Sequence, residues 1–150
     1  MTVVLRVLVW SGVLLVAAIS GMARASTEAW LSGAEIERQL AGSTIEGRYD
    51  TGRGFREAYG FDGRLAYAEE GTSEIFGTWS IVSNAFCTFY DTDLNGGCFR
   101  VTQPSDNCFH FHFAASTTEE AHWSDYAAPM WTAQAWLVDR PPTCDEKPMS

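Results

Sequence analysis

Basic side chains are scarce in this sequence. It has one lysine, Lys147, and ten lysines and arginines together against 19 aspartates and glutamates, a formal net charge of −9 at pH 7. A surface of this sign repels nucleic acids and anionic lipid headgroups. The composition therefore argues against a nucleic-acid partner and favours solubility or cationic partners.

Motifs for common catalytic chemistries are also missing. There is no Gly-x-Ser-x-Gly turn for a nucleophilic serine and no Cys-x-x-Cys for disulfide exchange. The acidic pairs Glu69-Glu70 and Glu119-Glu120 are adjacent residues, which point to opposite faces of a strand and so do not share a proton. We predict no catalytic residue and expect a non-enzymatic protein.

Only one long apolar run is present, from Val7 to Ile19. It follows Arg6 and precedes Ala23-Arg24-Ala25, which matches a small-x-small cleavage site. A membrane span needs about 20 apolar residues, more than this run supplies. We predict that residues 1–25 are a secretion signal, and that the protein is periplasmic or secreted without a membrane span.

Cleavage there would leave one domain over residues 26–150, beginning at Ser26. Its 125 residues would carry eight basic and 19 acidic side chains, a formal net charge of −11. This length suits one domain with one core. Because the chain is rich in aromatic residues, we expect it to fold.

All four cysteines follow the predicted cleavage site, at Cys87, Cys98, Cys108 and Cys144. In an exported chain they indicate two disulfides. The turn-rich run from Asp91 to Gly97 indicates a hairpin, whose opposed positions lie within disulfide distance. We therefore predict the pairs Cys87–Cys98 and Cys108–Cys144; the competing arrangement pairs Cys98 with Cys108.

A short helix is predicted from Gly33 to Ala41. Ser32 and Glu35 have the spacing of a capping box, and Gly42 suits the residue after a helix. Its apolar stripe is narrow, so we expect it to lie on the surface of a larger unit.

From Ser43 onward the hydrophobic period changes to two, which is typical of short antiparallel strands. We predict eight strands, at Thr44–Tyr49, Phe55–Tyr59, Arg64–Glu69, Glu74–Val82, Ala85–Tyr90, Cys98–Thr102, Cys108–Ala114 and Thr132–Val138. Short strands with local connections favour a mainly β fold, an antiparallel meander closed as a small barrel, because closure removes exposed edges. A two-sheet β-sandwich is the alternative.

The segment from Ala115 to Met130 interrupts the strand pattern. We expect a long loop or short helix that covers one end of the barrel, where a ligand site would lie. The alternative is a plug in which Trp123, Tyr126 and Trp131 seal the core.

Several runs between Trp30 and Phe113 resemble a known family. They are Leu31-Ser32-Gly33-Ala34-Glu35-Ile36, Leu40-Ala41-Gly42-Ser43-Thr44, Tyr59-Gly60-Phe61-Asp62-Gly63, Gly77-Thr78-Trp79-Ser80-Ile81, and Cys87 with Cys98 before an aromatic strand. They resemble small periplasmic proteins of proteobacteria in the domain-of-unknown-function 995 family. The resemblance implies an exported, lipocalin-like β domain, with no activity assigned.

All three histidines fall in one stretch, at His110, His112 and His122. The first two stand at i and i+2, so they share one face of a strand, and His122, or Glu119 or Glu120, could complete a tetrahedral Zn²⁺ site. Such histidines also bind Cu²⁺. Against this, the alternating phenylalanines 109, 111 and 113 are expected to face the core, which leaves the histidines on a solvated outer face.

Two hypotheses about function follow. The first is a non-enzymatic periplasmic domain, without a cofactor, that binds a small ligand or associates with an envelope protein. The alternative is a periplasmic metal-binding protein that uses His110, His112 and His122. The metal hypothesis requires the three imidazoles to lie within about 4–5 Å of a common point.

Overall fold

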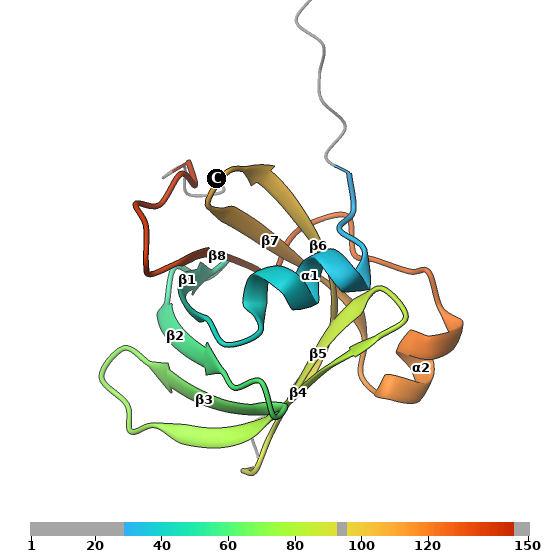
Figure 1. Cartoon of the computed structure of the whole chain (residues 1–150), viewed down its shortest axis with the longest axis horizontal. Coiled ribbons are helices and arrows are strands. Elements are labelled where there is room, and N and C mark those ends of the chain that lie inside the picture. Colours follow the sequence, from blue (N-terminus) through green and yellow to red (C-terminus); the bar gives the residue numbers. More distant parts are fainter. Residues whose placement is uncertain (1–28, 93–95, 146–150) are drawn as a thin grey trace, which may run out of the picture.

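The computed structural model describes residues 29–92 and 96–145. Four features discussed above lie wholly or partly outside these ranges: the predicted signal over 1–25, its cleavage site, the turn over 91–97 and Lys147. The described residues form a closed barrel of eight strands with one helix before it and a shorter helix between the last two strands (Figure 1). No helix in these ranges is long and apolar enough to cross a membrane.

The strands follow one another around the barrel in chain order. Their bounds are β1 (Thr44–Tyr49), β2 (Gly54–Tyr59), β3 (Arg64–Glu69), β4 (Ile75–Val82), β5 (Ala85–Tyr90), β6 (Gly97–Ser105), β7 (Cys108–Ala115) and β8 (Ala133–Leu137). Every neighbouring pair is antiparallel, and β8 pairs with β1, for example Gly47 with Ala135. The predicted closed meander is therefore confirmed, and the sandwich is not formed.

Strand β6 runs beyond its predicted end at Thr102. It continues to Ser105 because the pairing with β7 shifts register between Thr102 and Ser105. Such an irregularity accommodates Pro104, which has no amide hydrogen to donate to a ladder. The other strands begin and end within one residue of their predicted bounds.

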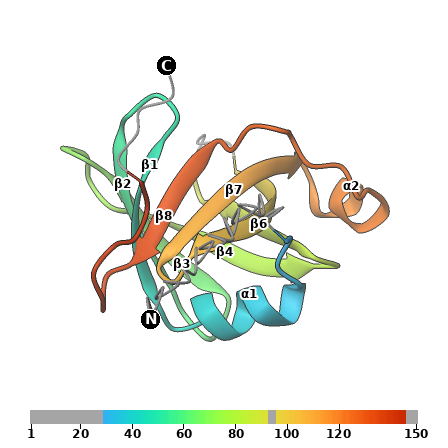
Figure 2. The ribbon, with the colours of Figure 1, turned by 90° about the horizontal axis from the view of Figure 1, so that it is seen from above.

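Helix α1 (Gly33–Leu40) begins with the predicted capping box. The Ser32 amide donates to the Glu35 carboxylate at 2.8 Å, and the Glu35 amide donates back to the Ser32 hydroxyl at 3.3 Å. Ile36 and Leu40 are buried in the same cluster as the inward-facing strand residues. The helix therefore closes one end of the barrel (Figure 2).

The barrel interior is lined by large rings on most strands and by small residues on one side. Gly47 of β1 and Ala133 and Ala135 of β8 form the small side. A Cβ at Gly47 would come within 2.6 Å of the Phe55 ring, so this glycine makes room for that ring. This unequal filling leaves space inside the barrel.

Helix α2 (Thr118–Trp123) lies against the outer wall of the barrel, not over its end. Its Ala121 packs with Cys87 and Cys98, which are paired across β5 and β6 and point outward. Trp123, two residues on, is 80% exposed, and Tyr126 is exposed as well. The segment Ala115–Met130 therefore contains the expected short helix, but this helix does not cover the barrel end. The alternative plug is not formed either, because α2 turns only the small Ala121 side chain toward the protein.

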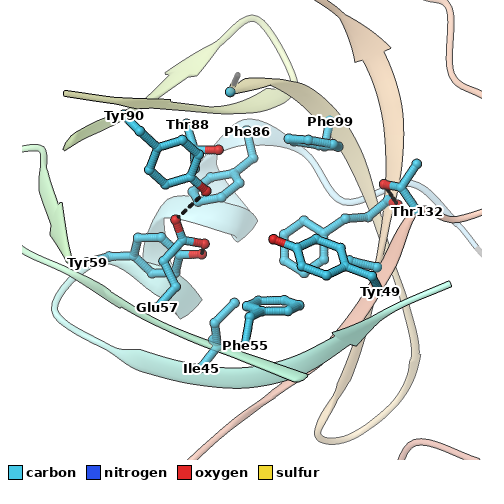
Figure 3. Close-up of a pocket in the computed structure, with 13 residues that line it drawn as sticks. Ile45, Tyr49, Phe55, Glu57, Tyr59, Phe86, Thr88, Tyr90, Phe99 and Thr132 are labelled. Atoms are coloured by element: carbon cyan, nitrogen blue, oxygen red, sulfur yellow. Dashed lines mark hydrogen bonds between the residues drawn. The ribbon is translucent and has the colours of Figure 1, made fainter. Parts of the chain in front are cut away.

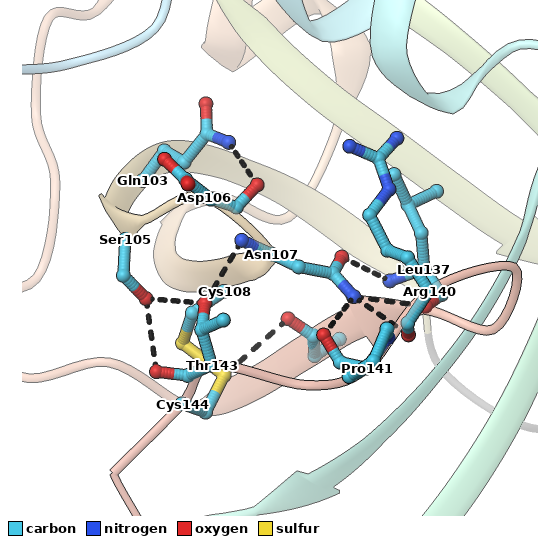
Figure 4. The surroundings of a disulfide bond; sticks show 11 residues. Gln103, Ser105, Asp106, Asn107, Cys108, Leu137, Arg140, Pro141, Thr143 and Cys144 are labelled. Atoms are coloured by element: carbon cyan, nitrogen blue, oxygen red, sulfur yellow. Dashed lines mark hydrogen bonds between the residues drawn. A yellow bond between two sulfur atoms is a disulfide. The ribbon is translucent and has the colours of Figure 1, made fainter.

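Both predicted disulfides are present, Cys87–Cys98 and Cys108–Cys144. The second attaches the C-terminal segment to the start of β7 (Figure 4). Beside it, the buried Asn107 side-chain amide donates to the carbonyls of Leu137, Arg140 and Pro141 at 3.0–3.1 Å. The tail is thus held by a covalent bond and a hydrogen-bonded clamp.

Candidate functional site: a cavity inside the barrel

A cavity of about 130 Å³ lies inside the barrel (Figure 3). Tyr49 and Tyr90, at the ends of β1 and β5, line it, whereas α1 contacts Asn84 in the β4–β5 turn. The cavity therefore occupies the barrel end away from α1. Its lining residues are Ile45, Tyr49, Phe55, Glu57, Tyr59, Phe86, Thr88, Tyr90, Gly96, Phe99, Phe111, Thr132 and Ala133.

Strand β2 brings a carboxyl group into this cavity. Phe55, Glu57 and Tyr59 occupy alternate positions of the strand, so they share its inward face. Glu57 is only 5% exposed. Glu57 was not among the predicted site residues. The sequence does contain a pattern that places it inside the barrel, because it alternates with two aromatic residues on the same strand.

Two phenols hold the Glu57 carboxylate. The Tyr59 hydroxyl donates to Glu57 Oε2 at 2.7 Å, and the Tyr90 hydroxyl donates to Oε1 at 3.0 Å. Burial raises the pKa of Glu57 to about 7, although both hydrogen bonds act in the opposite direction. No lysine, arginine or histidine is among the residues that line the cavity, so within the described ranges this carboxyl has no cationic neighbour there.

A second hydrogen-bonded chain begins at the cavity wall. The Tyr67 hydroxyl donates to Glu69 Oε1 at 2.7 Å, and Glu69 forms an ion pair with Arg53. The Tyr49 and Tyr67 hydroxyls lie 2.8 Å apart. Because the Tyr67 hydrogen is directed to Glu69, Tyr49 is the donor in this pair. Burial raises the pKa of Tyr49 and of Tyr67, which keeps both phenols protonated.

The structure places His110 and His112 together on β7, with the phenylalanine at 111 inside the barrel, as predicted. Their ring centroids are 6.5 Å apart. The prediction of a solvated face is wrong for His112, which is 7% exposed. Trp30 covers its ring at 5.0 Å, and its Nδ1 lies 2.9 Å from the Ala128 carbonyl oxygen.

The third histidine, His122, lies on α2 against Trp123. Within residues 29–92 and 96–145, no three His, Cys, Asp or Glu side chains are grouped so that they could hold a metal ion. Arg100 lies opposite His112 in the strand register. Metal binding by the histidines stays a prediction, and titration with Zn²⁺ or Cu²⁺ would test it.

Comparisons with protein-family models, with curated proteins and with solved structures found no match. The resemblance to the 995 family stays a prediction.

Proposed function

We propose that this protein is an exported, non-enzymatic binding domain that takes a small, mostly apolar molecule into the barrel. The observation that carries this proposal is the aromatic-lined cavity of about 130 Å³. An apolar cavity of about 150 Å³ in another protein is large enough to bind benzene. A few polar groups in a mostly apolar wall are typical of small-molecule sites, where they fix the orientation of the ligand.

The proposed location is the periplasm or the cell exterior. It is supported by the predicted signal over residues 1–25 and by two disulfides, which persist in oxidising compartments. We expect protein isolated from its own cell envelope to begin at Ser26, as N-terminal sequencing and intact mass would show. An intact Met1 in a membrane fraction would contradict this prediction.

Filling the cavity is expected to prevent binding. Ala133 lines the cavity from β8, so Ala133→Leu would occupy part of the space that a ligand needs. We expect benzyl alcohol, followed by protein-detected NMR, to bind the variant about tenfold more weakly than wild type, a difference of ~1.4 kcal/mol.

The matched control is Ala66→Leu on β3. Ala66 alternates with the buried Leu65 and Tyr67 and therefore points out of the barrel. This variant should bind benzyl alcohol as wild type does. If Ala133→Leu also binds it like wild type, the cavity is not the binding site.

A further inference from the structure

The phenol hydrogens around the cavity are all directed to acceptors within the protein. Tyr59 and Tyr90 donate to Glu57, and Tyr49 donates to Tyr67. Each phenol oxygen still has lone pairs, and each oxygen of the Glu57 carboxylate accepts one phenol hydrogen bond and can accept more. When Glu57 is ionised, these side chains can therefore accept hydrogen bonds from a ligand but have no hydrogen left to donate.

Of the two threonines of the cavity wall, Thr132 has its hydroxyl hydrogen bonded within the protein. The Thr132 hydroxyl donates to the Phe111 carbonyl oxygen at 3.0 Å. With Glu57 ionised, the phenols, the carboxylate and Thr132 thus offer only acceptors, which suits a ligand that donates hydrogen bonds and disfavours a carboxylate.

Among ligands that donate hydrogen bonds, the charge of the cavity favours those that are positively charged. The Glu57 carboxylate is buried and the cavity lining holds no cation, so an ionised Glu57 lacks the partner that buried charges normally have. The aromatic faces around it, among them Phe55, Phe86 and Phe99, attract cations through their negative ring faces. A positive donor would satisfy both the carboxylate and the rings.

We propose that the ligand is a small primary amine, whose ammonium group binds the Glu57 carboxylate while its ring or short alkyl body fills the aromatic part of the cavity. The proposal rests on the proposed function and names the chemical class of the ligand. Benzylamine, with one aromatic ring and one ammonium group, is a suitable probe for a cavity of this volume.

Amine binding should depend on pH through Glu57. The titratable groups around this carboxyl are the phenols of Tyr59 on β2, Tyr90 on β5, Tyr67 on β3 and Tyr49 on β1; β6, β7 and β8 contribute no ionisable residue to the lining. Beyond Tyr67 lies the ion pair between Glu69 and Arg53. Because the pKa of Glu57 is about 7, benzylamine should bind about 30-fold more weakly at pH 5.5 than at pH 8.

The experiment compares benzylamine, benzyl alcohol and benzoate by calorimetry at pH 8, with wild type, Glu57→Gln and the control Glu46→Gln. Glu46 is a solvent-facing carboxylate of β1 that pairs with Arg56. Wild type and Glu46→Gln should bind benzylamine about 30-fold more tightly than benzyl alcohol, as expected for a charged hydrogen bond of ~2 kcal/mol. Benzoate should not bind.

Glu57→Gln should lose the preference for the amine while it still binds benzyl alcohol. Equal affinities of wild type for benzylamine and benzyl alcohol would overturn the amine proposal and leave the binding function intact. An amine preference that survives in Glu57→Gln would also overturn it. If neither benzylamine nor benzyl alcohol binds wild type, the proposed function fails as well.

Discussion

Removal of the disulfide between Cys108 and Cys144 is expected to lower the free energy of unfolding by about 4 kcal/mol. The two cysteines are 36 residues apart, and the entropy that a cross-link removes from the unfolded chain grows with the length of the closed loop. The variant Cys108→Ala/Cys144→Ala, measured by urea denaturation against wild type, gives this value. A domain of this size has a total stability of roughly 5–15 kcal/mol, so the loss is a large part of it.

The matched control removes the other bridge with Cys87→Ala/Cys98→Ala. These cysteines are 11 residues apart, so the same reasoning gives a smaller loss of about 3 kcal/mol. If this second variant is the less stable of the two, loop length does not decide the contributions of the bridges. The packing of Ala121 over the Cys87–Cys98 disulfide would then explain the larger loss of stability in that variant.

The Cys108–Cys144 bridge lies close to the place where the barrel closes. Asn107 precedes Cys108, and its Oδ1 accepts a hydrogen bond of 2.8 Å from the Leu137 amide at the end of β8. Leu137 is paired with Ile45 of β1 in the closing ladder. The bridge and the Asn107 clamp therefore lie beside the ladder between β1 and β8, which has the greatest sequence separation of the eight strand pairs in the barrel.

The strands and their closure could be predicted from the sequence because each strand is short, alternates with period two and ends at a turn residue. The hairpin around Cys87 and Cys98 likewise fixed one disulfide, and the other followed by elimination. These inferences depend on local patterns alone. The position of α2 could not be obtained in this way, since it depends on which residues of the outer wall remain uncovered.

The candidate site was only partly accessible from the sequence. The inward position of Glu57 follows from its phase with Phe55 and Tyr59, but its second phenol, Tyr90, is 33 residues away on β5. That contact depends on the curvature of the barrel. The burial of His112 depends on Trp30, which precedes the barrel and reaches it through a bridge to Thr102.

Glu57 is also expected to make the stability of the ligand-free protein depend on pH. Burial raises its pKa from 4.5 in the unfolded chain to about 7 in the folded protein. Below the lower value both states hold the proton, and the group has no effect. As the pH rises from 4.5 to 7, the unfolded state releases its proton first, so the free energy of unfolding falls. Above about pH 7 the folded protein carries the full cost of a buried carboxylate, about 3 kcal/mol.

The variant Glu57→Gln keeps the shape of the side chain and removes its ionisation. It should be about as stable as wild type at pH 4 and about 3 kcal/mol more stable at pH 8, as measured by urea denaturation at both pH values. Glu46→Gln, which changes a solvent-facing carboxylate, should show no such difference between the two pH values. A stability gain in Glu57→Gln that is equal at pH 4 and pH 8 would show that the buried carboxyl is not the cause. A gain confined to high pH would identify Glu57 as a site where the folded protein is destabilised by an unpaired charge, which is the cost that binding of a cationic ligand would relieve.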